Sequence, residues 1–355
     1  MNFTELLTPR AVAANWTEAQ SNKIPYLGAT LFPSDKQAGL DMAFLKGHRG
    51  VPISLMPSAF DAKATFRDRI GFVKLESEMP FFREGYKVKE RDRQDLLRAR
   101  DITDPYAKSA IARIYDDSRD LIDSAEVVAE RMRMQLLFPL DGKPGISIRA
   151  NGMDYTYNYD QDGEWFANNY TALTGADLWT ASATADPFKH LQQIKDAVAG
   201  NSGGAPAIAI MNTTTFNMMA ATDAVKNRWL TTTGRSMGYL TAAEARKVIE
   251  ETVGLRVAIY DKQYRDEDKI VHKFVPDGYV ALIPEGDLGR TVYGTTPEEA
   301  DLMGSAEADV SIVNTGVALT RVIQAHPVNI DLFASEIVLP SFERMDEVAV
   351  LKVIA

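Results

Sequence analysis

The sequence contains no cysteine, which excludes disulfide bonds, thiolate metal ligands and cysteine nucleophiles. It has only 4 histidines, and none stands in an H-x-H, H-E-x-x-H or H-x-x-E-H pattern, so no zinc site is expected. The best apolar run, AIAIMNTTTF, is too short and too polar to cross a bilayer. The first residues also lack the basic segment and long apolar run of a secretory signal. We therefore expect a protein of an aqueous compartment.

Excess positive charge is also missing. The 355 residues carry a formal net charge of -10, with 45% hydrophobic and 25% charged residues, which is typical of a folded soluble protein. Neutralising a nucleic-acid backbone requires a basic footprint, so the charge argues against an intrinsic nucleic-acid binder. It remains compatible with a protein that encloses nucleic acid. The length is sufficient for two or more compact units.

The most unusual stretch runs from Phe72 to Asp101, where strand-like residues alternate with charges of both signs. From Lys74 to Asp101 there are eight Lys or Arg and seven Asp or Glu. A solvated surface hairpin is one interpretation, because exposed charge pairs contribute little individually. The aromatic residues Phe81, Phe82 and Tyr86 favour another: a long ribbon, with breaks at Pro80 and Gly85, that a neighbouring subunit completes. In that case the ribbon contributes little to the core of its own subunit.

A very long helix follows. Asp104 is a suitable N-cap, Pro105 suits the first helical position and Pro139 ends the pattern. A helix from Pro105 to Leu137 is about 50 Å long at 1.5 Å per residue. Its apolar side chains keep to one face, which predicts that it lies across a sheet. They are Ile111, Ile114, Leu121, Ile122, Ala125, Val128, Met132 and Leu136.

The remaining sequence alternates between strand and helix patterns. Residues 145–160 predict a hairpin with a primed turn at Asn151-Gly152. Helices are expected from Asp186 to a stop at Gly200, as one continuous segment over 213–229, and over 241–253. Strands are expected between and after these helices, and the last forty residues are almost wholly strand-like. The first fifty residues, rich in Pro and Gly breaks, resemble an extended arm with little core of its own.

One catalytic motif is present in outline. GRSMG, residues 234–238, matches the G-x-S-x-G pattern with Ser236 as the nucleophile of a serine hydrolase. That motif needs a strand directly before it and a helix directly after it. Here NRWLTTT precedes it and has the pattern of a helix end. A flexible glycine loop is the better interpretation, and the hydrolase stays as an alternative.

Several segments, in order, resemble a known family. A tyrosine-bearing segment after LRVAIYD leads to the run Phe274, Val275, Pro276 and Asp277, and then to Gly289-Arg290 and Tyr293-Gly294. LLTPRAVAANW, GHRGVPIS and the tail TRVIQAHPVNIDLFASEIVLPSFERMDEVAVLKV resemble the same proteins. Together they resemble the lambda-type major head protein family, the major capsid proteins of tailed bacteriophages. An encapsulin-like cellular shell protein is a weaker alternative.

The resemblance implies an α+β architecture, the Hong Kong 97-type phage capsid fold. This fold comprises an N-terminal arm, an extended E-loop ribbon, a peripheral domain with a long spine helix, and an axial α/β domain. The corresponding boundaries are residues 1–50 for the arm, 51–101 for the ribbon, 102–180 for the peripheral domain with its spine helix and hairpin, 181–312 for the axial domain, and 313–355 for strands that return to both domains.

The resemblance also implies a structural protein without catalytic residues, cofactor or metal. It would assemble with itself into pentamers and hexamers of an icosahedral shell around double-stranded DNA, with only nonspecific DNA contact. Scaffold, portal and decoration proteins would be further partners, and the virion its location after assembly in the host bacterial cytoplasm. From the charged stretch we expect inter-subunit contacts through Phe81, Phe82, Arg83, Lys87, Lys89, Arg91 and Arg93.

Overall fold

In a computed structural model, the chain folds into two compact units. Each unit is built from segments that lie far apart in the sequence. The first unit comprises Met1–Ala43, Glu76–Arg131 and Arg290–Ser341, and the second comprises Phe44–Leu75, Met132–Gly289 and Phe342–Ala355. The structure describes residues 8–20, 25–46, 73–90, 105–150, 152–234, 238–305, 308–324, 326 and 329–355.

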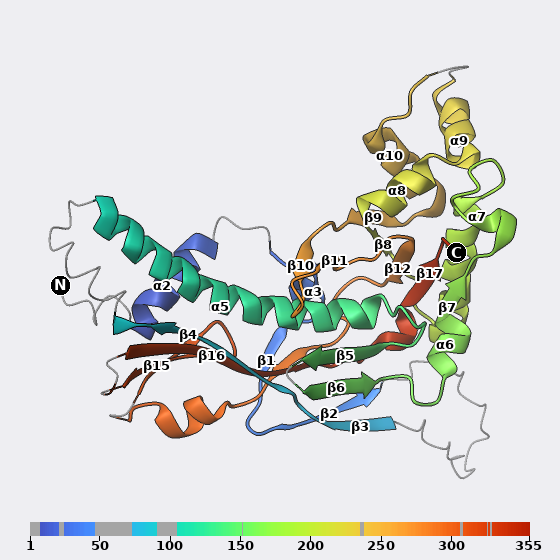
Figure 1. Cartoon of the computed structure of the whole chain (residues 1–355). Helices are drawn as coiled ribbons and strands as arrows, with labels where there is room; N and C mark the ends of the chain where they lie inside the picture. The colour runs from blue at the N-terminus through green and yellow to red at the C-terminus, as the bar shows by residue number, and fades with distance from the viewer. Residues whose placement is uncertain are drawn as a thin grey trace, which may run out of the picture. The chain divides into compact units, whose positions relative to one another are not determined.

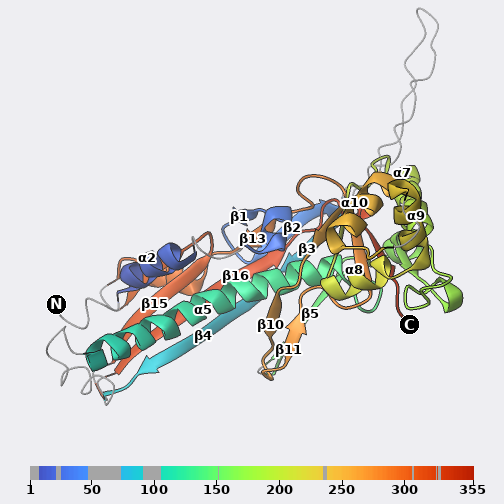
Figure 2. The same cartoon turned by 90° about the horizontal axis from the view of Figure 1, so that it is seen from above.

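The first unit contains the long helix and one large sheet (Figures 1 and 2). Its helical elements are α2 (Pro9–Gln20), α3 (Leu27–Leu31), most of α5 (Pro105–Leu137) and the single π-turn η2 (Glu298–Leu302). Its strands are β1 (Ser34–Lys36), β4 (Phe81–Val88), β13 (Thr291–Tyr293), β14 (Asp309–Val313), β15 (Val317–Gln324) and β16 (Asn329–Pro340). The strands run in the order β1-β13-β16-β15-β14, and β4 also pairs with β16.

Strand β16 is the centre of this sheet. Its residues 329–335 pair with β15, 330–337 with β4 and 338–340 with β13, all antiparallel. All but one of its twelve residues are buried. The buried residues include the polar Asn329, Asp331, Ser335 and Glu336, so both faces of the strand are covered.

The predicted packing of the long helix on a sheet is confirmed. Leu121, Ile122 and Ala125 of α5 form one buried cluster with Val317 and Leu319 of β15. Further along the helix, Ala129 is fully buried and Val128 only half-buried. The buried face at this point is therefore centred on Ala129 and not on Val128 as predicted. The described side chains of α5 begin at residue 116, so the predicted contacts of Ile111 and Ile114 lie outside them.

The N-terminal segment contributes more to the core than its Pro and Gly breaks indicated. Val12 and Trp16 of α2 belong to the same buried cluster as α5. The indole Nε1 of Trp16 donates to Asp123 at 2.9 Å. Further along, the backbone N–H of Gly28 donates to Glu130 at 2.9 Å. The expectation of an arm with little core is therefore wrong for the described part, because the arm packs along the long helix.

The second unit is an α/β structure. Its five-stranded sheet has the order β7-β17-β12-β8-β9. These strands are β7 (Tyr170–Ala172), β8 (Ile208–Met211), β9 (Arg256–Ile259), β12 (Tyr279–Ile283) and β17 (Ala349–Lys352). Around them lie α6 (Glu164–Asn169), η1 (Gly175–Asp177), α7 (Pro187–Ser202), α8 (Thr213–Ala220), α9 (Asp223–Thr233), α10 (Ala242–Val253) and η3 (Met345–Glu347).

Two hairpins complete this unit: β5 (Gly145–Ala150) with β6 (Met153–Asn158), and β10 (Gln263–Arg265) with β11 (Val271–Lys273). The first confirms the predicted hairpin, with Gly152 in the left-handed region at φ 78. A third pair, β2 (Asp41–Lys46) and β3 (Val73–Glu78), forms another two-stranded sheet.

The helix ends follow the capping rules, with two corrections. The side chain of Asp186 caps α7 as predicted, but the helix continues past Gly200 and ends at Gly203, which has φ 77. The single helix expected over 213–229 is two helices, because Thr222 adopts an extended conformation between α8 and α9. The capping box of α10, in which Thr241 and Glu244 bond each other's backbone N–H, confirms the predicted start of that helix.

Gly85 is a third correction. It was expected at a break of the ribbon, but it lies inside β4 and pairs with Phe333 of β16. A Cβ added at Gly85 would lie 2.7 Å from the Leu332 carbonyl oxygen and still closer to the Phe333 ring. Glycine is therefore required by close packing of two strands and not by a turn.

Candidate inter-subunit surface on strand β4

Strand β4 places most of the predicted contact residues on one face. Because side chains alternate along a strand, Phe81, Arg83 and Lys87 point to one side of the sheet and Phe82 to the other. The register confirms this, since Arg83 lies opposite Ser335 and Lys87 opposite Asp331 on β16. We call Phe81, Arg83 and Lys87, together with Lys89 directly after the strand, the basic face of β4. Arg91 and Arg93 lie outside the described residues.

Arg83 is held by an ion pair and by an aromatic ring. Its guanidinium forms an ion pair with Glu298 of η2 and lies 4.8 Å from the centre of the Phe81 ring. The Ser335 hydroxyl donates to the same carboxylate at 2.9 Å. The Glu298 side chain is 8% exposed, whereas that of Arg83 is 46% exposed. Positive charge thus faces solvent while its compensating negative charge is buried.

Lys87 repeats this arrangement four residues further on. Its Nζ lies 3.6 Å from Asp331 Oδ2, and the exposed fractions of the two side chains are 47% and 6%. Gln324 Nε2 donates to the same oxygen at 2.7 Å. The other oxygen, Asp331 Oδ1, is buried and accepts no hydrogen bond from the described residues. A buried carboxylate of this kind strengthens the need for a nearby cation.

The opposite face of β4 is buried only at its end, at Val88. Val88 packs in a buried cluster with Ile330 and Leu332 of β16. Phe82 lies opposite Glu336 in the register and is half-buried. The expectation that the ribbon contributes little to its own subunit is therefore wrong for β4. Within the chain, the acidic partners of Arg83 and Lys87 are Glu298 and Asp331; contact with a neighbouring chain stays a prediction for all seven residues.

Tyr86 lies on the core side of β4 but at its exposed edge. The side chain is 42% exposed. Burial of its remaining surface, with smaller effects from Glu84, Asp120 and Asp117, raises the pKa of the Tyr86 hydroxyl above its ordinary value. The phenol therefore stays neutral at physiological pH.

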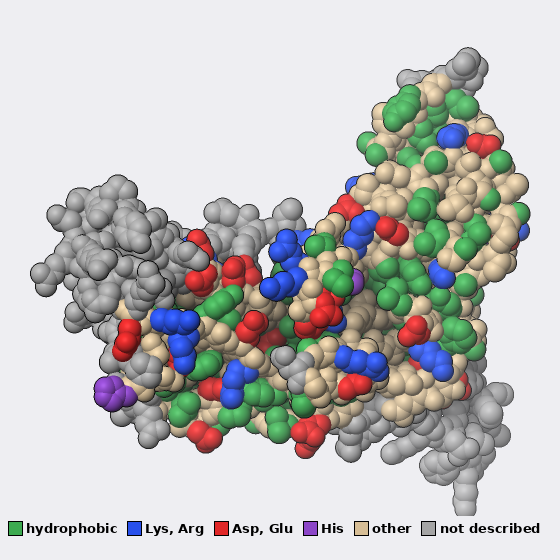
Figure 3. Space-filling model, viewed as in Figure 1, with side chains coloured by type: hydrophobic (Ala, Val, Ile, Leu, Met, Phe, Trp, Pro, Cys, Tyr) green, Lys and Arg blue, Asp and Glu red, His purple; other side chains and the backbone are tan. Residues whose placement is uncertain are grey.

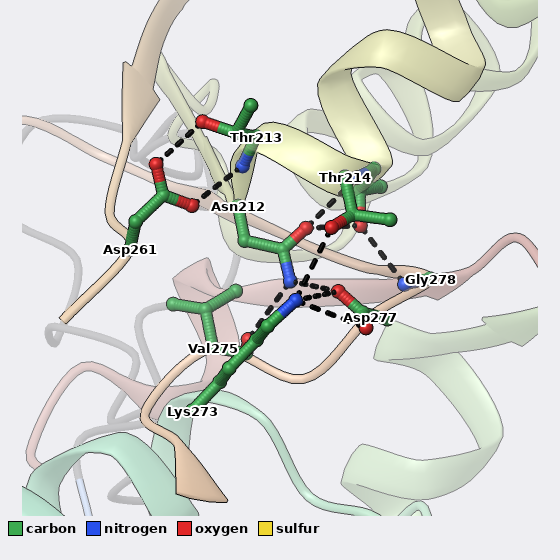
Figure 4. Close-up of polar contacts among 9 residues, drawn as sticks. Asn212, Thr213, Thr214, Asp261, Lys273, Val275, Asp277 and Gly278 are labelled. Atoms are coloured by element: carbon green, nitrogen blue, oxygen red, sulfur yellow. Dashed lines mark hydrogen bonds and ion pairs between the residues drawn. The ribbon is translucent and has the colours of Figure 1, made fainter. Parts of the chain in front are cut away.

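A second polar cluster lies in the other unit, where strand β8 leads into α8 (Figure 4). Asn212 caps α8 by accepting from the Thr215 backbone N–H at 2.8 Å. Its Nδ2 donates to the Val275 carbonyl at 3.0 Å and to Asp277 Oδ1 at 2.6 Å. Lys273 Nζ bonds both oxygens of Asp277, at 2.8 and 3.1 Å. The cluster thus ties the start of a helix to the segment before β12.

The electrostatics of this cluster support a structural role. Burial raises the pKa of Asp277, but hydrogen bonds from Lys273, Asn212 and Thr214 outweigh it and hold that pKa below its ordinary value. Asp261 similarly accepts from the Thr213 backbone N–H at 2.8 Å and from its hydroxyl. A carboxylate that stays ionised and bonded to neighbours stabilises a connection. Asp277, one of the residues that carried the family resemblance, thus connects the start of α8 to the segment before β12.

The other candidate sites from the sequence find no support. Ser236 lies outside the described residues, and the segment before it is the end of α9, with Gly234 in the left-handed region at φ 65. The strand that a nucleophile elbow needs is absent from that position. Among the described residues there is no group of three or more His, Asp or Glu side chains able to hold a metal ion. None of the described helices is long and apolar enough to cross a membrane.

Sequence reasoning missed the internal partners of the basic face. Glu298 stands next to a second acid, Glu299, and Asp331 lies in a strand-like run. Acids in a strand-like run, here Asp331 and Glu336, are a usable signal, because a buried carboxylate requires a partner. For Asn212 the signal was also present: Asn followed by three Thr after an apolar strand is typical of a helix start.

Comparisons with known proteins agree with one another. A family model described as phage major capsid protein E matches residues 8–353. A prophage protein from E. coli CFT073, described as a capsid protein, has 14% identity and a TM-score of 0.58, over 100% of this chain and 99% of its own. A phage-related protein from Bordetella bronchiseptica RB50 has 11% identity and a TM-score of 0.56, over 97% of both chains.

The capsid of cyanophage A-1(L) is a third similar structure, with 12% identity, a TM-score of 0.52, and 93% of this chain and 92% of that chain covered. Curated protein sequences gave no match. At these identities the three structures demonstrate a shared fold, and the family model covers nearly the whole chain.

Proposed function

Since the chain belongs to the family of phage major capsid protein E, it is a capsid-forming protein of the Hong Kong 97-type fold, and we propose that it builds the icosahedral head of a tailed bacteriophage. The family match over residues 8–353 is the observation that carries this. Its place is the virion, and the proposed intermediate location is the host bacterial cytoplasm during assembly. The proposed building blocks are pentamers and hexamers of this chain. The serine hydrolase and the encapsulin-like shell are not favoured.

The predicted division of the chain is part of this proposal. We assign residues 1–50 to an N-terminal arm, 51–101 to the ribbon, 102–180 and 181–312 to peripheral and axial domains, and 313–355 to returning strands. The existence of two compact units, one with most of the long helix and one with the α/β sheet, supports a division into two main domains. The units nevertheless divide the proposed ribbon between residues 75 and 76 and the proposed peripheral domain between residues 131 and 132. The proposal is also supported by the α5 helix of 33 residues, which suits a spine across the sheet.

The net charge of the chain and its family membership are the basis for what we propose about the contents and the accessory partners of the shell. We expect double-stranded DNA inside, touched only weakly and nonspecifically, because the chain carries a formal charge of -10. Figure 3 shows acidic and basic side chains interspersed over the described surface in that view. Scaffold, portal and decoration proteins are the further proposed partners. We propose no catalytic activity, cofactor or metal.

We propose that the seven ribbon residues Phe81, Phe82, Arg83, Lys87, Lys89, Arg91 and Arg93 contact neighbouring subunits. The outward position of the Arg83 and Lys87 cations, above buried acids, supports this proposal. Each exposed pair contributes little, but a closed shell repeats the same contact many times.

The experiment compares folding with assembly in one double variant. Arg91→Glu with Arg93→Glu should keep a native circular dichroism spectrum and lose the fast-sedimenting particles. Arg91→Lys with Arg93→Lys is the matched control and should still assemble, because it keeps both charges. Unchanged shells in the glutamate variant would show that Arg91 and Arg93 make no contact needed for assembly.

Two further measurements test the proposed function as a whole. Negative-stain microscopy of the purified protein should show shells, capsomers or tubes; uniform small particles would contradict it. Ser236→Ala should leave assembly intact, whereas a hydrolase built on GRSMG would lose its activity.

A further inference from the structure

His190 of α7 is a buried imidazole with a neighbour at each ring nitrogen. The residue is 5% exposed. The indole Nε1 of Trp179 donates to its Nδ1 at 3.3 Å, and its Nε2 lies 3.7 Å from Asp177 Oδ1. Because Nδ1 accepts a hydrogen bond, the neutral ring carries its proton on Nε2, toward Asp177. The fold around His190 therefore requires one neutral tautomer.

Trp179 holds segment 175–185, which includes η1 and leads into α7, against that helix. The Trp179 ring is 1% exposed and belongs to one buried cluster with Ala185, Leu191 and Ile194. Its backbone N–H donates to the Val353 carbonyl at 3.1 Å. A buried indole needs a hydrogen-bond partner for its ring N–H. Here that partner is the imidazole of His190, so the position of the ring depends on an acceptor that can titrate.

A cavity of about 250 Å³ lies beside the imidazole. His190 and Gln193 of α7 line one side of it, and Thr171 and Leu173 line another. Gln193 and Thr171 are exposed, so the rim of the cavity is open to solvent. A cavity of this size with polar groups at its rim admits water. A proton from solvent can therefore reach an imidazole that is otherwise buried.

Protonation of His190 is incompatible with the hydrogen bond from Trp179. Both ring nitrogens of an imidazolium carry a proton, so Nδ1 can no longer accept. Two N–H donors would then face each other in a buried site, and a buried donor without an acceptor is destabilising. The indole must move away for the ring to hold the proton. Because Trp179 holds segment 175–185 in place, this movement loosens the segment.

The electrostatics around His190 set the direction of its titration. Burial is the largest effect and lowers the pKa of His190 below its ordinary value; Lys189 acts in the same direction, whereas Asp177 and Asp186 oppose it. Among the described residues, charges on α6, α9, α10 and η3, which also pack against α7, are not among the causes. The stabilisation by neutral His190 is therefore complete above its unfolded pKa, about 6.5, and is lost as the pH falls through the lower folded pKa.

We infer that His190 is a proton sensor: on acidification Nδ1 takes up a proton from solvent, Trp179 loses its acceptor, and segment 175–185 detaches from α7. The inference goes beyond the proposed function, because every group in it belongs to one compact unit of one chain. The sensor acts in the free subunit as well as in a shell.

Tryptophan fluorescence tests the sensor on the full chain. The part of the emission that Trp179→Phe removes should shift to longer wavelength with a midpoint below about pH 6.5, while the far-ultraviolet circular dichroism stays native. His190→Gln should abolish this shift, because its amide oxygen accepts from the indole N–H and does not titrate. His272→Gln is the matched control and should keep the shift, since the His272 side chain is 44% exposed and lies in another hairpin.

Hydrogen exchange locates the movement. At about pH 5, peptides from residues 175–185 should exchange about tenfold faster in the unaltered chain than in His190→Gln. Equal exchange in the two proteins, or a fluorescence shift that persists in His190→Gln, would overturn the sensor.

Asp177→Asn provides a test that keeps His190 in place. The Asp177 side chain is 65% exposed, so we expect this variant to fold. Loss of a carboxylate that favours the imidazolium should move the fluorescence midpoint to lower pH. An unchanged midpoint would show that His190 is not the titrating group. None of these measurements requires shells, so their failure leaves the proposed function intact.

Discussion

Replacing Leu121 by Asp in α5 should abolish folding of the subunit. Leu121 is 2% exposed and lies in one cluster with Trp16, Val313, Val317 and Leu319. Truncating a leucine at such a site costs about 2–5 kcal/mol of unfolding free energy. Aspartate removes the same apolar surface and adds an unpaired charge, which costs several kcal/mol more. The sum is comparable with the whole stability of a domain, about 5–15 kcal/mol.

The assay is urea unfolding of the soluble fraction, followed by circular dichroism. Leu121→Ala should remain folded with a lower midpoint, and Leu121→Asp should be recovered unfolded or insoluble. Ser124→Asp is the matched control, because it introduces the same residue on the exposed side of the same helix. We expect that control to change stability by no more than about 0.5 kcal/mol. Recovery of soluble, shell-forming protein with Leu121→Asp would refute the assigned packing of α5 on the sheet.

Four further outcomes are expected. Gly85→Ala should lower the thermal midpoint, because the added Cβ would meet the Phe333 ring; an unchanged midpoint would contradict the strand register. Thr241→Ala removes the capping box of α10 and should cost about 1 kcal/mol in urea unfolding. The pKa of Asp277 is lowered in the folded state. Ionised Asp277 therefore stabilises the folded protein at pH values above its pKa in the unfolded chain, about 3.9, and this stabilisation is lost as the pH falls through the lower folded pKa. Asp277→Asn should weaken this pH dependence of the unfolding free energy. Unassembled protein should show no duplex-DNA gel shift at physiological salt, and a tight, salt-sensitive shift would contradict the charge argument.

The elements that sequence reasoning predicted well are those with local signals. The bounds of α5 at Pro105 and Leu137 agree with the structure, because a proline start, a long apolar stripe and a later proline are all adjacent in sequence. The same holds for the caps at Asp186 and Thr241. The order of several such segments was also sufficient to identify the family, although each segment alone is an ordinary structural motif.

The features that sequence reasoning missed depend on strand register. Nothing near Arg83 in sequence indicates that it pairs with Glu298, 215 positions later by their numbers. Gly85 was interpreted as a break because glycine is common in turns, and only its pairing with Phe333 reveals the close approach. The break between α8 and α9 was missed because the extended backbone of Thr222 interrupts an otherwise helical composition.

Strand β4 combines two roles because its two faces differ. One face carries Val88 into the core with Ile330 and Leu332, so the strand is fixed to its own subunit. The other presents Arg83 and Lys87 outward over buried acids, so the same strand offers charge to solvent. Changes at Val88 should therefore act on folding. Reversal of Arg83 or Lys87 should also lower the stability of the subunit, because each cation pairs with a buried carboxylate. A fully solvated hairpin would not place its cations beside buried carboxylates, so the pairs of Arg83 with Glu298 and of Lys87 with Asp331 show that β4 is an integral part of the sheet.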